Sequence, residues 1–278
     1  MSPWALITPS SRGIGLAVTR HVLQTTKCPV VATARKDLDK TRDAVLNGLD
    51  VDKSRLTVLR VDVTNESTIE AAASHCASAF PKQDNRLHLA FALPGLLFPE
   101  KSPQQVSAAD ALLTYQTNAL GPLLLMKHFS PFLPTKRTPL PSAADIADEV
   151  YAGLPPSHAV WATFSARVGS ISDNNLGGWY SYRSSKAAVN QLTKTFDNHL
   201  RTASGEKAIA VALHPGTVKT NLSKEFWGSV KEEKLFEPEW VAERLIGLVT
   251  GRNISDVKPI GVEGRGQCWD WKGDEIPP

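Results

Sequence analysis

The stretch Trp4-Ala-Leu-Ile-Thr-Pro-Ser-Ser-Arg-Gly-Ile-Gly15 decides the fold of this 278-residue chain. Its apolar start predicts a β-strand over residues 4–8, and the pattern that follows predicts a helix over residues 13–25. A turn of small residues that opens a helix presents backbone N–H groups to an anion, and the helix dipole adds to their attraction. Gly13 and Gly15 allow the backbone to approach a pyrophosphate closely. The stretch therefore predicts a phosphate-binding turn.

Strand and helix patterns alternate along the rest of the chain, with no linker or internal repeat between them. Repeated alternation predicts an α/β fold with a parallel sheet and right-handed crossovers. A polar, Pro-rich stretch at 135–157 is expected to be a surface insertion. The predicted strands are 4–8, 29–33, 56–61, 87–93, 159–164 and 209–213, and the predicted helices are 13–25, 38–49, 67–80, 107–129, 179–202 and 241–249.

Composition excludes several classes of protein. A hydrophobic fraction of 42% and a net charge of +3 exclude a disordered chain. Three widely spaced cysteines without metal-ligand spacing predict neither a metal site nor a disulfide framework. No apolar run spans a membrane and no signal peptide is visible, so we expect a cytoplasmic protein. Basic residues do not cluster as they do in proteins that bind nucleic acid.

The end of the second predicted strand bears on the choice of cofactor. A dinucleotide site that favours NAD usually has an acidic residue there, whereas this chain has Arg35. A guanidinium matches a phosphate in a forked geometry, and Arg12 in the turn is placed to reach the same group. Either arginine alone is equally well explained as a surface cation. Together they favour NADP(H) over NAD(H).

Tyr182 and Lys186 form a candidate acid–base pair. Their spacing of four places the phenol and the ammonium on one face of a helix. That helix follows the fifth predicted strand, at the carboxyl edge where open α/β sheets bind ligands. A phenol has an ordinary pKa near 10, which is too high for efficient acid–base work at neutral pH. A neighbouring ammonium lowers the pKa of the phenol by favouring the phenolate.

With these features in place, the sequence resembles the short-chain dehydrogenase/reductase family, and within it the sniffer-like or C-factor-like carbonyl reductases. The resemblance covers nearly the whole chain. It implies one domain over residues 1–278, built as a Rossmann-type doubly wound parallel sheet with helices on both faces. It also implies an NADP(H)-dependent oxidoreductase that interconverts a carbonyl and a secondary alcohol. Besides the glycine-rich turn, the matching motifs are Asp62-Val-Thr64, Asn118, Ser165-Ala-Arg-Val-Gly-Ser-Ile171, Gly177-Gly-Trp-Tyr-Ser-Tyr-Arg-Ser-Ser-Lys186, His214-Pro-Gly-Thr-Val-Lys-Thr220 and Trp269-Asp-Trp-Lys-Gly273.

The resemblance implies a role for each matching residue. Tyr182 is implied as the general acid in carbonyl reduction and as the base in alcohol oxidation. Lys186 is implied to lower the pKa of the phenol, together with the oxidised nicotinamide, and to bind the ribose. Asn118 is implied to hold a water in a proton relay; the ordinary alternative is a helix-interior amide bonded to a neighbouring backbone. The residues implied to bind the cofactor are Thr8, Ser10, Ser11, Arg12, Gly13, Ile14, Gly15, Arg35, Asp62, Val63, Gly95, Tyr182, Lys186, Pro215, Gly216, Val218 and Thr220, with Asp62 and Val63 beside the adenine and the last four around the nicotinamide.

Three positions depart from the family pattern. Pro9 replaces the first glycine of the turn, so one N–H donor is lost. Ala92-Leu-Pro-Gly95 replaces an Asn-Asn-Ala-Gly motif, and only Gly95 remains. Ala166 stands where the family has the serine that orients the substrate carbonyl. The candidates for that role are Ser165 and Ser170, of which Ser165 is preferred because it ends the strand.

The segment 221–237 is implied to cover the substrate. Phe226 and Trp227 are expected to form an apolar wall with Trp179 and Phe98, although core aromatics under a loop are an equal alternative. Such a wall predicts an apolar ketone, aldehyde or secondary alcohol as substrate. The family's usual habit implies a homodimer or homotetramer, formed through the long helices. A relative repurposed for non-redox chemistry or as a binding module is the second hypothesis.

Overall fold

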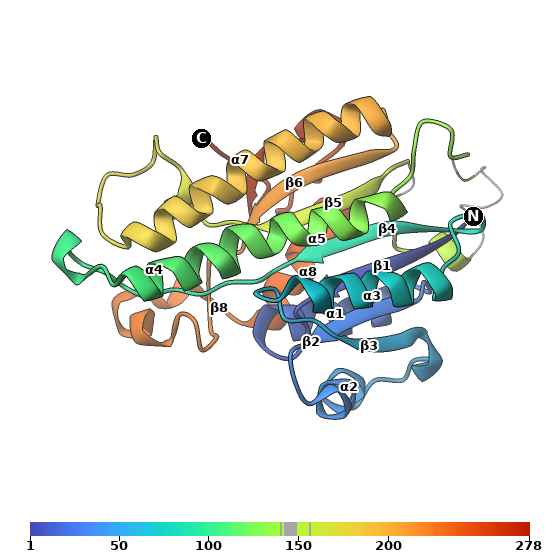
Figure 1. Ribbon diagram of the computed structural model, residues 1–278, viewed down its shortest axis with the longest axis horizontal. Coiled ribbons are helices and arrows are strands. Elements are labelled where there is room, and N and C mark those ends of the chain that lie inside the picture. The colour runs from blue at the N-terminus through green and yellow to red at the C-terminus, as the bar shows by residue number, and fades with distance from the viewer. Residues whose placement is uncertain (140, 142–148, 156) are drawn as a thin grey trace.

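The computed structural model describes residues 1–139, 141, 149–155 and 157–278. One eight-stranded sheet runs through the molecule, with helices on both of its faces (Figure 1). Its strands pair in parallel except for the last, which runs antiparallel to its neighbour. In spatial order they are β3 (Leu56–Arg60), β2 (Val30–Ala34), β1 (Ser2–Thr8), β4 (Asn85–Ala92), β5 (Ala159–Phe164), β6 (Ala208–His214), β9 (Cys268–Asp270) and β10 (Glu275–Ile276).

The strand order confirms the doubly wound fold. The chain starts in the middle of the sheet, winds outward through β2 and β3, and then returns to the other side of β1 to build β4, β5 and β6. Ligands of such sheets bind beyond the carboxyl ends of the strands, at the point where the winding reverses. That point lies between β1 and β4. All six predicted strands are present, whereas the short β9 and β10 were not predicted.

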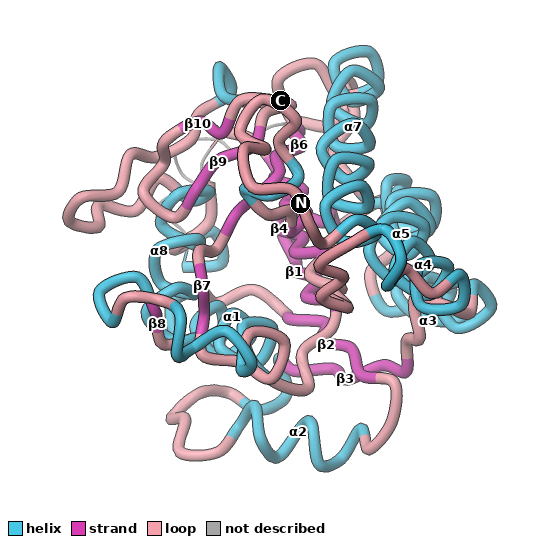
Figure 2. The backbone as a smooth tube through the Cα atoms, turned by 90° about the vertical axis from the view of Figure 1, so that its left-hand side faces the viewer, coloured by secondary structure: helices cyan, strands magenta, loops and turns pink. Residues whose placement is uncertain are grey.

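Two layers of helices cover the sheet. The helices α1 and α8 lie on one face, while α3, α4, α5 and α7 lie on the other, as Figure 2 shows. Helix α2 lies beside β2 and β3 at one edge of the sheet. The helices are α1 (Gly13–Thr25), α2 (Leu38–Leu46), α3 (Glu66–Ala79), α4 (Ala108–Tyr115), α5 (Gly121–Phe129), α7 (Tyr180–Ala203) and α8 (Pro238–Thr250).

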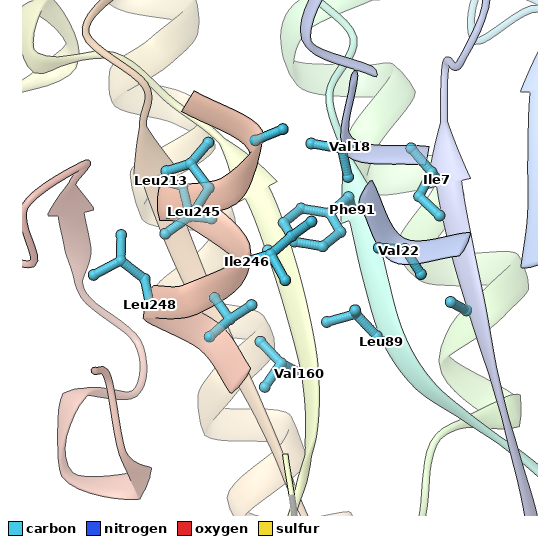
Figure 3. Packing of buried hydrophobic residues seen from close by; sticks show 14 of the residues in the cluster. Ile7, Val18, Val22, Leu89, Phe91, Val160, Leu213, Leu245, Ile246 and Leu248 are labelled. Atoms are coloured by element: carbon cyan, nitrogen blue, oxygen red, sulfur yellow. The ribbon is translucent and has the colours of Figure 1, made fainter. Parts of the chain in front are cut away.

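The strands are buried on both faces, as alternation of their side chains requires. In β1, Ala5 and Ile7 belong to the core shared with α1 and α8, whereas Trp4 and Leu6 belong to the opposite core. Phe91 of β4 is packed in the first of these cores (Figure 3). This double cover fixes the strands rigidly, and with them the loops at their carboxyl ends.

The predicted helix over residues 107–129 is interrupted. It consists of α4, a π-helical turn at Gln116–Leu120 and α5. A π turn inserts one residue into the helical repeat, and such turns are frequent at functional sites. Asn118 lies in this turn and is fully buried.

The register of the strands aligns the loops that carry the predicted site. Thr8 pairs with Ala92, so the turn after β1 lies beside the loop after β4. Phe164 pairs with Leu213, so Ser165 directly follows β5 next to the end of β6. Four loops therefore meet at one edge of the sheet.

The predicted insertion at 135–157 lies partly outside the described residues, which here end at 139 and resume, apart from 141, with a short 3-10 helix at Glu149–Tyr151. Leu154 and Tyr151 pack on the core shared with α1 and α8. In the described ranges, no helix combines the length and the apolar character that a membrane span requires.

Candidate active site

The turn between β1 and α1 is folded tightly onto the helix that it opens. A Cβ atom on Gly15 would lie 1.9 Å from the carbonyl oxygen of Pro9, so only glycine fits there. Gly13 has a φ of +55°, in the left-handed region that favours glycine. No described side chain caps the N-terminus of α1. The turn therefore offers bare backbone and a helix N-terminus to a ligand, as the sequence predicts.

The structure corrects the expectation for Ser10. Its side chain is fully buried, and its hydroxyl donates to the Ile7 carbonyl (2.9 Å) and accepts from the Thr19 hydroxyl (2.9 Å). Ser10 therefore braces the inside of the turn, and its hydroxyl does not face a cofactor. Thr8 is buried as well, whereas Ser11 and Arg12 are exposed. The Thr8–Pro9 peptide bond is cis.

A long cleft of 610 Å³ runs from this turn along the carboxyl edge of the sheet. It passes between the loop after β4 and the loop after β6. At its inner end it reaches the start of α7, where Tyr182 and Lys186 lie. The residues of the predicted cofactor site that line it are Arg12, Gly13, Ile14, Gly15, Gly95, Tyr182, Lys186, Pro215 and Thr220.

The predicted adenine end lies outside the lining of this cleft. Arg35 follows β2 and Asp62 follows β3, and the charge of Arg35 acts on the carboxylate of Asp62. Burial alone raises the pKa of Asp62, but hydrogen bonds from Thr64 and the charges of Arg35 and Arg60 outweigh it and hold the pKa below its ordinary value. Val63 contacts Gly121 at the π turn. Arg35 and Asp62 are thus close enough for their charges to interact, and their contacts with the adenine end of a cofactor stay predictions.

Tyr182 and Lys186 meet in the first turns of α7. Their side chains are 7% and 3% exposed, respectively. Burial raises the pKa of Tyr182 to about 12 and lowers the pKa of Lys186 to about 8. The ammonium donates to the Phe164 carbonyl (2.8 Å) and lies 5.7 Å from the centroid of the Tyr182 ring. The predicted pair is therefore brought together where the cleft ends.

Asn118 joins the loop after β4 to helix α7. Its amide oxygen accepts from the Leu96 N–H (2.7 Å), and its amide nitrogen donates to the Leu96 carbonyl (2.8 Å) and to the Ser185 hydroxyl (3.0 Å). Ser185 in turn donates to the Tyr182 carbonyl (2.7 Å). The side chain thus behaves as the helix-interior amide of the ordinary alternative, and it clamps the loop after β4 onto α7. Its role in a proton relay stays a prediction.

Neither candidate serine directs its hydroxyl at Tyr182. The hydroxyl of Ser165 donates to the Asn190 side-chain oxygen (2.5 Å) on α7, although Ser165 lines the cleft. The hydroxyl of Ser170 donates to the carbonyl of Pro278 (3.4 Å) and accepts from the Asp173 N–H (3.0 Å). The preference for Ser165 as the substrate-orienting serine is therefore corrected. Ala166, which has no hydroxyl, lines the aromatic cavity together with Ser165 and Tyr182.

A second hollow, the aromatic cavity, adjoins the long cleft and encloses 620 Å³. Trp179 and Phe226 form part of its wall, with ring centroids 4.9 Å apart. Among the described lining residues, Phe98 and Trp227 do not appear, which corrects the expectation for both. The Trp227 indole instead donates to the Ser223 hydroxyl (3.0 Å). The residues that line both hollows are Ile14, Leu97, Ser165, Tyr182, Pro215, Thr220, Leu222 and Phe226.

The segment 221–237 folds over this cavity. It contains 3-10 helices at Lys224–Ser229 and Glu232–Lys234, and it is closed at its base by the pairing of β7 (Thr217–Val218) with β8 (Leu235–Phe236). Val218 and Gly216 line the aromatic cavity rather than the long cleft.

Sequence reasoning missed the polar side of the aromatic cavity. The polar residues that line it are Arg167, Asp173, Asn175, Arg183 and His214. Burial is the main cause that lowers the pKa of His214 to about 3, so this imidazole is neutral. Its place as the last residue of β6, at the carboxyl edge, is the signal that would have indicated it.

The arrangement matches known proteins over almost its full length. The family model described as Enoyl-(Acyl carrier protein) reductase matches residues 9–249. The chain belongs to the short-chain dehydrogenase/reductase family. This confirms the family predicted from the motifs.

Relatives in this family include oxidoreductases of several kinds. The 1-hydroxy-2-glutathionyl-2-methyl-3-butene dehydrogenase of Rhodococcus sp. (strain AD45) is 30% identical over 219 residues, 77% of this chain and 79% of the relative. The NADPH-bound carbonyl reductase from chicken fatty liver is 26% identical, with a TM-score of 0.76 over 99% of this chain and 98% of that chain. The carbonyl reductase Sniffer of D. melanogaster shares the fold at 21% identity, with a TM-score of 0.76 over 100% and 99% of the two chains. As a member of this family, the chain is an oxidoreductase.

Proposed function

We propose that this oxidoreductase uses NADP(H) to interconvert a carbonyl and a secondary alcohol, with Tyr182 as general acid and base. The observation that carries the proposal is the position of Tyr182. It lines both the long cleft and the aromatic cavity, and the ammonium of Lys186 lies behind its ring. A proton donor between a cofactor cleft and an apolar cavity suits reduction of a carbonyl held in that cavity.

The residues of the long cleft fit a dinucleotide. The turn at Gly13 and Gly15 offers backbone and a helix N-terminus to the pyrophosphate. Arg12 lines the cleft, and Arg35 lies beside Asp62 at the ends of β2 and β3. A 2′-phosphate is the anion that suits this pair, and the carbonyl reductase from chicken fatty liver, which the chain resembles, was solved with NADPH. NADP(H), when bound, supplies or accepts the hydride.

Residues of this chain carry out the proton transfer and exclude water from the site. Tyr182 donates a proton to the carbonyl oxygen during reduction and takes it back during oxidation. Below pH 8 Lys186 carries a charge that opposes the effect of burial on the phenol. Trp179 and Phe226 exclude water from the carbonyl. Because Ala166 lacks a hydroxyl, the phenol of Tyr182 is the donor on which the carbonyl depends.

The substrate that suits the cavity is an apolar ketone or aldehyde, or the matching secondary alcohol. Its aromatic wall continues into aliphatic side chains at the mouth, where Leu176 is 92% exposed. The direction that we propose is reduction, because Arg12 and Arg35 favour NADP(H) as the cofactor.

The test is consumption of NADPH across a panel of ketones, quinones and aldehydes. Tyr182→Phe is expected to lower turnover about a hundredfold or more, because the proton donor is lost. Binding of NADPH, followed by fluorescence titration, is expected to stay unchanged. Full turnover by the variant would contradict the role of Tyr182.

The alteration at Ala166 also supports a second candidate function. A relative that binds NADP(H) without reducing carbonyls, for non-redox chemistry or partner binding, has no need of a substrate-orienting serine. It has no need of Tyr182 and Lys186 together either, which is why we rank it second. Absence of turnover with every carbonyl, together with tight binding of NADPH, is the result that would favour it.

We infer a homodimer or homotetramer that forms through the α4–α5 side of the molecule. Leu112 on α4 is 60% exposed, and Leu120 at the end of the π turn and Leu123 on α5 are 45% and 42% exposed. A row of exposed leucines on one helical unit is typical of a protein–protein contact. Light scattering on the protein and on its Leu112→Glu variant tests this: a monomeric variant of an oligomeric parent is the expected result.

All three cysteines are buried free thiols. Free thiols persist in a reducing compartment, and we therefore place the enzyme in the cytoplasm.

A further inference from the structure

A buried acid lies at the start of the helix that carries the catalytic pair. Glu100, in the loop after β4, is only 5% exposed. One oxygen of its carboxylate accepts from the Ser181 N–H (3.2 Å), and the other accepts from the Ser181 hydroxyl. Its backbone carbonyl accepts from the Trp179 N–H (2.6 Å). Ser181 is the immediate neighbour of Tyr182, so these bonds hold the backbone next to the catalytic phenol.

Helix α7 depends on this distant residue for its cap. Trp179, at the N-cap position, has a φ of +52° and caps nothing with its own side chain, and the first turn contains no acidic residue. The first N–H groups of a helix need acceptors. Glu100 supplies one from 81 positions away in the sequence. The cap is therefore a tertiary contact between the loop that lines the long cleft and the helix that carries Tyr182.

The charge of Glu100 has no cation to balance it. Among the described residues, no ion pair includes this carboxylate. Each of its two oxygens accepts a donor from Ser181, which suits the ionised form. What faces the negative charge is the positive end of the dipole of α7, a helix of 24 residues.

We propose that Glu100 is a positioning residue for Tyr182: it fixes the first turn of α7 and so holds the phenol in place, and its charge offsets the positive end of that helix. The proposal rests on the proposed role of Tyr182 as acid and base. Without Glu100, the positive end of the helix would be unbalanced and would favour the phenolate of Tyr182. With Glu100, the first turn of α7 keeps the phenol where the long cleft meets the aromatic cavity.

Other charged groups also lie around Tyr182. Lys186 and Arg183 lie on α7 itself, and Arg183 donates to the Gly177 (3.0 Å) and Gly178 (3.0 Å) carbonyls. On the facing elements of the aromatic cavity lie Arg167, Asp173 and His214. In the described part of the chain, none of these groups is bonded to the Glu100 carboxylate, so a change in the pH profile is expected to report the loss of this one charge.

The experiment compares Glu100→Gln and Glu100→Ala with Asp110→Asn, a matched control that removes a carboxylate from the first turn of a different helix, α4. The pH dependence of kcat is measured in both directions for a substrate of the wild-type enzyme, and binding of NADPH is titrated. For Glu100→Gln we expect the limb that reports the phenol to move to lower pH by about half a unit or more. For Glu100→Ala we expect kcat to fall about tenfold or more. NADPH binding of both variants, and every property of Asp110→Asn, are expected to match the wild type.

An unchanged pH profile in Glu100→Gln would overturn the proposal. This variant keeps the shape of the glutamate side chain and one acceptor oxygen, so it is expected to fold even if Glu100→Ala does not. Wild-type kcat in a folded Glu100→Ala would overturn it as well. Tyr182→Phe, assayed in parallel, distinguishes a failure of the inference about Glu100 from a failure of the proposed function. If that variant is inactive while Glu100→Gln keeps the wild-type profile, only the inference about Glu100 fails. If Tyr182→Phe is active, the proposed function itself fails.

Discussion

The ammonium nitrogen of Lys186 lies 5.7 Å from the centroid of the Tyr182 ring, and it donates to the Phe164 carbonyl rather than to the phenol. Burial drives the two groups towards their neutral forms, since it raises the pKa of Tyr182 to about 12 and lowers that of Lys186 to about 8. Lys186 therefore carries its charge only below about pH 8. The lysine is charged in the pH range where reduction is expected to run, and its charge there opposes the effect of burial on the phenol.

Ala166 is the position at which catalysis is expected to improve. It lines the aromatic cavity, as Tyr182 does, and a hydroxyl there is expected to add a second donor to the substrate oxygen. Loss of one such donor typically costs a hundredfold or more in rate, so Ala166→Ser is expected to raise the kcat for carbonyl reduction about tenfold or more. Steady-state kinetics with a carbonyl that the wild type reduces slowly measures this.

Ser170→Ala is the matched control for that gain. Its hydroxyl faces the Pro278 carbonyl, so its removal is expected to leave kcat unchanged. A rate for Ala166→Ser equal to that of the wild type would mean that the carbonyl is not bound against this side of the cavity.

Arg12 and Arg35 are expected to select the cofactor. If each contacts the 2′-phosphate, replacement by alanine removes a charge-assisted hydrogen bond and weakens NADPH binding about tenfold or more per residue. NADH lacks that phosphate, so its affinity is expected to change little. Fluorescence titration of both cofactors gives the ratio, and equal losses for NADPH and NADH would refute the assignment.

Local features of the site could be predicted from the sequence. The turn at Gly15 and the pair of Tyr182 and Lys186 each lie within one short stretch, and the carboxyl-edge rule places them together. The substitution at Ala166 could be predicted for the same reason. Each of these features depends only on the spacing of residues along a short stretch of sequence.

Features made by contacts between distant segments could not be predicted. The hydroxyl of Ser10 points inward because it donates to the Ile7 carbonyl and accepts from the Thr19 hydroxyl. These bonds exist only once the turn has folded. Glu100 caps a helix that begins far along the chain. Strand β9 exists because Cys268 and its neighbours pair with β6, although the run is too short to show a period of two.

Lys186 also makes the stability of the free protein depend on pH. Burial lowers its pKa from 10.5 to about 8, so between these values the unfolded chain binds a proton that the folded protein does not. The free energy of unfolding therefore rises with pH across this window. Below about pH 8 the folded protein holds a charged ammonium in a buried site, so the full free-energy cost of burying that charge is present. In Lys186→Met this contribution is absent. The expected result is that the melting temperature of the wild type, relative to that of Lys186→Met, is constant below about pH 8 and increases from pH 8 towards 10.5.

Thermal unfolding of the cofactor-free protein at a series of pH values measures this difference, and Lys194→Met is a control on the same helix, since Lys194 is exposed. The comparison cancels every titration that the two proteins share, because only the group at 186 differs. A gap between wild type and Lys186→Met that stays flat from pH 7 to 10.5 would mean that Lys186 keeps its ordinary pKa in the fold, and that the ammonium remains available to the phenol of Tyr182 well above pH 8.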